Sequence, residues 1–268
     1  MPAPETQQRL AALRAVIADI ERKPALAEAR SRVQAQAGGF PVLGPGLVQE
    51  IFTDTARDGG AGLGFALGQA RTLLTGRRLA ILYVQLAEEA QSAGLPYGPG
   101  LAWFGLDPAR LAIVRAASLG DLLWTAEEAM ACRAVAAILV DIKGSPRLLN
   151  FTASRRLSLR AAAGGVSLFM LRSGARREAS ASHLRWRLSP ARSGRKPFDA
   201  RAPGPARWRL RLEKGQLAGG ETDWLLEWTK DGFTSFPAGS AGPDRRHAGT
   251  ALPGAVPAAL GDRLPQTA

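Results

Sequence analysis

From Phe40 onward, short apolar runs alternate with helical stretches, and this alternation constrains the fold more than any other feature of the sequence. Residues 79–84 and 136–141 are continuous apolar runs, as expected of strands buried inside a parallel sheet. Residues 63–74 and 119–132, which lie between such runs, have the composition of helices. Strands that alternate with helices predict βαβ units with right-handed connections. We therefore expect an α/β protein with a mostly parallel sheet.

The two ends of the chain have other patterns. Residues 1–39 are expected to form an N-terminal helical arm, which either packs on the core or docks a partner protein. Within it, residues 4–23 place five apolar side chains on one helical face: Leu10, Leu13, Val16, Ile17 and Ile20. Residues 237–268 are dominated by Ala, Gly and Pro without periodicity, which predicts a disordered tail. The folded core is thus expected over residues 40–236.

The last part of this core changes to a period of two. Residues 182–188 and 206–212 alternate polar with apolar side chains, which is typical of half-exposed strands. Residues 223–228 and 232–236 have the pattern of a closing hairpin. The Pro-, Gly- and Arg-containing stretch 189–205 is expected to be an extended excursion. Antiparallel strands therefore extend the predicted parallel sheet.

Positive charge is concentrated in the second half of the chain. The sequence has 35 Lys and Arg against 23 Asp and Glu, a formal net charge of +12. Residues 143–214 hold 18 of the basic residues and three carboxylates, so this segment carries +15 and the remainder −3. Such a density of charge favours a polyanion or an acidic protein as partner.

Residue counts exclude several classes of site. The single cysteine, Cys132, rules out an internal disulfide and a Cys-based zinc site, and His183 and His247 are too isolated to predict a metal centre. The longest apolar runs, 79–86 and 134–142, are shorter than the roughly 20 residues that span a bilayer. Charged residues near the N-terminus argue against a signal peptide. We expect a cytoplasmic protein with no membrane contact.

Six short segments, in order between residues 40 and 230, carry the most specific signal. They are QEIF (49–52), GLDPARL (105–111), SLGDLLWTAEE (118–128), FTASRRL (151–157), RWR (207–209) and WLLEW (224–228). Together they resemble the ImuA family, the RecA-related accessory proteins of bacterial mutagenic repair cassettes. Six segments in the expected order are more specific than any single motif.

This resemblance carries expectations about fold, role and partners. The fold would be a degenerate RecA-like core, related to P-loop NTPases. The role would lie in damage-induced (SOS) translesion DNA synthesis. The implied protein partners are an ImuB-like Y-family protein and an error-prone replicative-type polymerase. RecA itself is a further candidate partner, for the basic surface.

The segment in the place of the RecA phosphate-binding loop departs from the motif. A phosphate loop needs G-x-x-x-x-G-K-[ST], in which lysine reaches the terminal phosphates and the hydroxyl holds Mg²⁺. Residues 53–63 keep Gly59, Gly60 and Gly62 but contain no lysine and no Ser or Thr after the glycines. Charge neutralisation and metal positioning are both missing. We expect no ATPase activity, no bound cofactor and no metal.

Asp141, at the end of an apolar strand, resembles the Walker B aspartate. It would then be a magnesium ligand, but the phosphate loop lacks the hydroxyl that shares this ion. We interpret Asp141 as a strand-end carboxylate that caps nearby backbone or pairs with Lys143 or an arginine.

Arginines of the basic segment are the candidate binding residues for DNA or for an acidic partner protein. Three lie on the expected helix 151–163, and five follow the expected strand 166–171, where RecA-like proteins carry loops that face DNA. These eight are Arg155, Arg156, Arg160, Arg172, Arg176, Arg177, Arg185 and Arg187. Trp186 and Trp208 alternate with arginines at strand period, which is more typical of core residues than of a base-stacking platform.

These observations favour a non-catalytic adaptor in SOS translesion synthesis that binds partner proteins and DNA. The first alternative is a nucleotide-dependent RecA-like regulator in which the altered loop binds ATP in another way. A generic basic DNA-binding protein is the second alternative.

Overall fold

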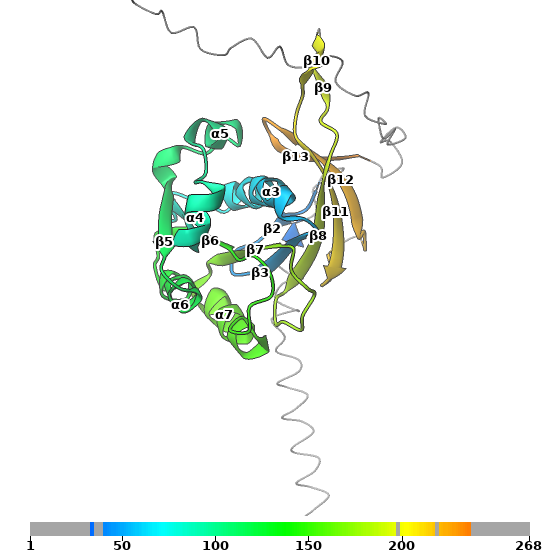
Figure 1. Ribbon diagram of the computed structural model, residues 1–268. Helices are drawn as coiled ribbons and strands as arrows, with labels where there is room; N and C mark the ends of the chain where they lie inside the picture. The colour runs from blue at the N-terminus through cyan, green and yellow to red at the C-terminus, as the bar shows by residue number, and fades with distance from the viewer. Residues whose placement is uncertain (1–32, 35–39, 197–198, 218–219, 237–268) are drawn as a thin grey trace, which may run out of the picture. The chain divides into compact units, whose positions relative to one another are not determined.

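A computed structural model describes residues 33–34, 40–196, 199–217 and 220–236 (Figure 1). It contains a nine-stranded sheet of strand order β13-β12-β11-β8-β3-β7-β6-β4-β5. A short antiparallel pair of β1 (Val33–Gln34) and β2 (Val42–Leu43) precedes it in the chain. Apart from β1, the expected helical arm over 1–39 lies outside the described residues, and so does the expected tail over 237–268.

Six neighbouring strands of the sheet run parallel to one another. They are β3 (Val48–Thr53), β4 (Ala80–Leu86), β5 (Leu111–Ala116), β6 (Val135–Asp141), β7 (Ser167–Ser173) and β8 (Leu184–Ala191). β3 and β7 are buried at every position, because helices cover both faces of the sheet there. The predicted mostly parallel α/β sheet is confirmed.

Three antiparallel strands extend the sheet beyond β8. They are β11 (Arg207–Lys214), β12 (Asp223–Thr229) and β13 (Gly232–Phe236). Lys230 and Asp231 form the turn between β12 and β13, as the sequence predicts.

The stretch 189–205 is more regular than the expected excursion. β8 continues to Ala191, and β9 (Arg195–Lys196) pairs with β10 (Asp199–Pro203) to extend the β8–β11 hairpin (Figure 1). The backbone N–H of Gly194 donates to the Pro205 carbonyl between the two paired regions. The excursion is therefore a β-hairpin.

Helices cover the two faces of the sheet. On one face lie α6 (Leu119–Ala129) and α7 (Phe151–Gly164), and on the other lies α3 (Gly59–Thr72), with α4 (Ala87–Ala93) and α5 (Gly98–Trp103) nearby (Figure 1). Two 3₁₀ turns, η1 (Ala56–Asp58) and η2 (Pro108–Arg110), precede α3 and β5. The Ser118 and Asn150 side chains cap α6 and α7 by accepting backbone N–H bonds. Each face thus has its own apolar core.

Tryptophans from the antiparallel strands fill the core on the α3 face. Trp186 and Trp208 are 0% and 2% exposed, and Trp224 and Trp228 pack beside them. The indole N–H of Trp186 donates to Gln49 Oε1 at 2.8 Å. The interpretation of Trp186 and Trp208 as core residues is confirmed, and the arginines that alternate with them face the opposite side of the sheet.

Candidate functional site

The segment that corresponds to the phosphate loop is folded mostly into a helix. β3 ends at Thr53, η1 occupies residues 56–58, and α3 begins at Gly59. Gly59, Gly60 and Gly62 therefore belong to the first turn of α3, and Gly59 has a right-handed φ of −54°. The glycines line no open loop in which backbone N–H groups could wrap a phosphate.

Two arginines of the basic segment hold the carboxylate of Asp54, next to this turn. Arg187 donates from Nε at 3.1 Å and from Nη2 at 2.7 Å to Asp54 Oδ2. Arg177 donates from Nη2 to Asp54 Oδ1 at 3.1 Å. The hydrogen bond from Arg187, followed by that from Arg177, lowers the pKa of Asp54. The position beside the former phosphate loop is thus occupied by an arginine–carboxylate cluster.

Asp141 lies at the carboxyl end of β6, with Tyr83 of β4 as its partner. The Tyr83 hydroxyl lies 3.1 Å from Asp141 Oδ2 and 2.9 Å from Gln85 Oε1. Lys143 forms its ion pair with Glu89, and its charge also acts on Asp141. Burial raises the pKa of Asp141, because the charged carboxylate loses water.

Glu50, in the middle of β3, organises a buried polar network that the motif analysis missed. Its Oε2 accepts hydrogen bonds from Ser180 at 2.7 Å and Ser182 at 2.9 Å, and from Arg185 Nε at 2.9 Å. Arg172 lies 3.8 Å from its other oxygen, and both side chains are 2% exposed. A glutamate in a short strand that also contains Val48, Ile51 and Phe52 was the available signal for a buried charge partner.

This network changes the roles of two predicted binding residues. Arg172 is buried, donates to the Gly144 carbonyl at 3.1 Å and lies over the Phe52 ring. It is therefore not available to a DNA phosphate, and its prediction as a surface residue is wrong. Arg185 is only 12% exposed and is held by Glu50. Both cations stabilise the junction of β3, β7 and β8.

The arginines of α7 divide into paired and unpaired side chains. Arg156 binds Glu127 of α6 at 2.5 Å, and Arg160 lies near Glu127 and Glu128 at 3.7 and 3.6 Å. Arg155 is exposed and has no ion pair within the described part of the chain. The accessible positive charge of this helix therefore centres on Arg155.

The loop after β7 shows the same division. Arg177, besides Asp54, contacts Glu213 at 3.2 Å and lies over the Phe52 ring. The side chain of Arg176 is exposed, and no ion pair of it occurs among the residues that the structure describes. Arg176 and Arg155 are thus the accessible cations among the predicted residues outside the sheet.

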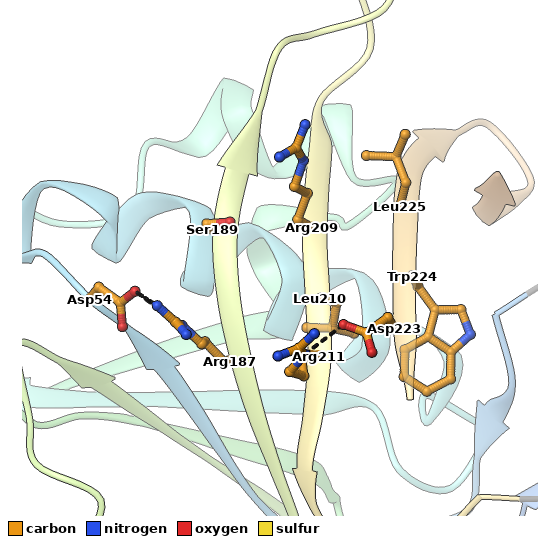
Figure 2. Close-up of a pocket in the computed structure, with 9 residues that line it drawn as sticks. All are labelled: Asp54, Arg187, Ser189, Arg209, Leu210, Arg211, Asp223, Trp224 and Leu225. Atoms are coloured by element: carbon orange, nitrogen blue, oxygen red, sulfur yellow. Dashed lines mark hydrogen bonds and ion pairs between the residues drawn. The ribbon is translucent and has the colours of Figure 1, made fainter. Parts of the chain in front are cut away.

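The open face of β8 and β11 forms a shallow basic hollow of about 350 Å³ (Figure 2). Arg187, Arg209 and Arg211 line it, and the rest of the lining is Ser189, Asp54, Leu210, Asp223, Trp224 and Leu225. Arg209 and Arg211 were missing from the predicted site residues. The signal for them was the alternation of arginine with Trp208 and Leu210, which places both on the same exposed face.

Within the described residues, no helix is long and apolar enough to cross a membrane. The same residues contain no group of three or more His, Cys, Asp and Glu side chains that could hold a metal ion. The candidate site is therefore defined by arginines and their carboxylate partners.

The sheet order, the helices on both faces and the altered phosphate segment define an α/β protein consistent with a RecA-like core. The chain is 33% identical to Protein ImuA of Caulobacter vibrioides over 218 residues, in each of two strains (NA1000 / CB15N and ATCC 19089 / CIP 103742 / CB 15). The match covers 75% of this chain and 81% of the relative. This chain belongs to the ImuA family. No family model matches it.

Proposed function

We propose that this protein is a non-catalytic accessory factor of damage-induced, error-prone translesion DNA synthesis. Its membership of the ImuA family supports the process. The single observation that carries the non-catalytic role is the phosphate segment, where the three glycines are helical and no lysine is present. ATP hydrolysis by the RecA route needs a phosphate cradle, a cation at the terminal phosphates and a metal-binding hydroxyl. Residues 53–63 contain no lysine and no Ser or Thr after the glycines.

Asp141 fits the same role. The tyrosine hydroxyl at 3.1 Å and the burial that raises its pKa describe a structural carboxyl group. A magnesium ligand of the Walker B type would instead share its ion with a phosphate-loop hydroxyl. The chain therefore acts by binding, and its proposed partners are an ImuB-like Y-family protein, an error-prone replicative-type polymerase and RecA.

The surface around Arg155 on α7 is the proposed contact for a protein partner. Phe151 and Leu159 lie one helical turn on either side of Arg155 and are 48% and 60% exposed. Leu148, just before the helix, is 60% exposed. An unpaired cation flanked by exposed apolar side chains suits a partner helix that carries both an apolar face and a carboxylate.

Co-purification with the ImuB-like protein from damaged cells tests this contact. We expect Arg155→Glu to reduce the amount of captured partner about tenfold. The new carboxylate would face the carboxylate of the partner, and like charges that face each other across an interface are strongly unfavourable. Arg110→Glu, a charge reversal at an exposed position in η2, is the matched control and should leave capture unchanged. Damage-induced mutagenesis should fall in cells that carry Arg155→Glu and should be unchanged in cells that carry Arg110→Glu. Undiminished capture by Arg155→Glu would remove α7 as the contact.

A further inference from the structure

The outer face of the antiparallel strands presents arginines in a regular grid. Along β11, Arg207, Arg209 and Arg211 alternate with buried side chains, and in the β8–β11 register Arg211 lies opposite Arg187 and Arg209 opposite Ser189. Neighbouring strands are about 4.8 Å apart, and side chains on the same face repeat about every 6.7 Å along a strand. Guanidinium groups at this spacing can contact successive phosphates of one extended nucleic-acid strand.

Most cations of this grid already have a carboxylate partner. Arg187 binds Asp54, and Arg211 donates from Nε to Asp223 Oδ1 at 2.7 Å. Arg209 is exposed, and within the described residues it forms no ion pair. It lies two residues from Arg211 along β11, and the two paired arginines, Arg187 and Arg211, remain 51% and 61% exposed. A ligand in the hollow can therefore contact the guanidinium of Arg209. It can also contact those N–H groups of Arg187 and Arg211 that do not bind the carboxylates.

The remaining lining of the hollow is compatible with a nucleotide unit. Ser189 on β8 provides a hydroxyl next to Arg209, and Leu225 of β12, directly opposite Arg209 in the register, adds an apolar side chain to the lining (Figure 2). The tryptophans of these strands are buried on the other face, so base stacking on them is excluded. A ligand here would be held by its backbone phosphates and would be recognised without regard to base sequence.

The positive charge continues from the hollow along the hairpin extension. Residues 189–205, between the paired parts of β8 and β11, contain four Arg and Lys and one Asp. Arg192 and Lys196 are exposed on this extension. Further exposed cations in the segment next to the hollow suit a polymer of phosphates better than a single free nucleotide or a compact acidic protein.

We propose that the open face of β8 and β11, centred on Arg209, binds the phosphate backbone of single-stranded DNA. Guanidinium groups bind phosphates through paired N–H donors, so the fixed orientations of Arg187 and Arg211 favour this ligand. In a duplex the nearest phosphates of opposite strands are separated by grooves about 6 and 12 Å wide, which this closely spaced grid does not match. This inference rests on the proposed function and adds its DNA ligand.

Fluorescence anisotropy with a labelled oligo(dT) of about 20 nucleotides tests the site. We expect Arg209→Ala to weaken binding about tenfold at low salt and to lower the slope of log K against log salt by about 0.7, the value for one phosphate contact of a single strand. Arg110→Ala, which removes an exposed cation from η2 far along the chain from β8 and β11, is the matched control and should bind as the unchanged protein does. The thermal midpoint of each variant verifies that the fold is kept.

Three results would overturn the inference: equal binding by Arg209→Ala, an equal loss in Arg110→Ala, or tighter binding of a duplex of the same length. Damage-induced mutagenesis in cells separates this inference from the proposed function. A chain that supports mutagenesis but leaves oligo(dT) unbound would contradict the DNA site and leave the accessory role standing. A chain that binds oligo(dT) through Arg209 but neither supports mutagenesis nor captures its partner would contradict the accessory role alone.

Discussion

Asp141 shows how one residue of a RecA-like site takes on a structural role. Its carboxyl group is buried beside the Tyr83 hydroxyl, and burial raises its pKa above the ordinary value of 3.8. The folded state therefore binds the proton more tightly than the unfolded state does. It follows that the contribution of Asp141 to stability is greatest at low pH and falls as the pH rises through the folded-state pKa.

We expect Asp141→Asn to gain stability relative to the unchanged protein as the pH rises from about 4 through the raised folded-state pKa of Asp141, because Asn cannot acquire the charge that burial disfavours. Asn can still accept the hydrogen bond from Tyr83. Urea unfolding of both proteins across this range measures the difference in the free energy of unfolding. The comparison isolates Asp141, since Asp54 and Asp223, whose pKa values are lowered, titrate in both proteins. A difference that stays constant or shrinks with pH would contradict this account.

Single residues also show what the sequence could predict. The burial of Trp186 and Trp208 follows from a period of two, which is a local property of the strand. The burial of Arg172 and Arg185 does not, because their partner is Glu50 and Arg185 is 135 residues away from it in the chain. Sequence spacing cannot identify a carboxylate that the fold brings across the sheet.

At the scale of elements, helix α3 begins at Gly59, inside the segment that corresponds to a phosphate-binding loop. Gly60 and Gly68 occupy the same helix in different surroundings. A Cβ at Gly60 would meet no atom within 4 Å, whereas a Cβ at Gly68 would lie 2.6 Å from Phe233 and 2.8 Å from Trp228. The first glycine is a remnant without a packing role, and the second lets β12 and β13 approach the helix.

These two glycines give a matched pair of substitutions. Gly60→Ala should raise the free energy of unfolding by about 0.5 kcal/mol, because alanine favours the helical backbone. Gly68→Ala should lower it by about 2 kcal/mol, because the aromatic side chains must move. Chemical denaturation measures both. A loss of stability in Gly60→Ala comparable with that in Gly68→Ala would contradict this, because it would mean that the backbone at Gly60 is not helical or that its surroundings leave no room for a methyl group.

The strands and helices themselves were largely predictable, and their exact starts were not. The apolar runs of β4 and β6, and the alternation of polar and apolar residues in β8 and β11, were sufficient to predict these four strands. A cluster of glycines, by contrast, is compatible with a loop and with a helix that is held by packing. The β9–β10 hairpin escaped prediction because Pro and Gly residues conceal its strand pattern.

For the whole molecule, the fold pairs many of the positive charges of residues 143–214 with carboxylates from other parts of the chain. Carboxylates from outside residues 143–214, among them Glu50, Asp54, Asp223 and Glu227, pair with arginines inside that segment. The basic segment is therefore a set of ion pairs with a few accessible cations, chiefly Arg155, Arg176 and Arg209. These cations are the candidates for binding, and residues 53–63 contain no lysine.

The claim that this chain works by binding without nucleotide chemistry is tested most directly by titrating labelled ATP and Mg²⁺ against the purified protein, with and without single-stranded DNA. The account predicts no saturable binding in either case, because the helical glycines and the Asp54–Arg187 pair leave no cradle for a triphosphate. Saturable binding in the micromolar range would contradict it and favour the nucleotide-dependent regulator.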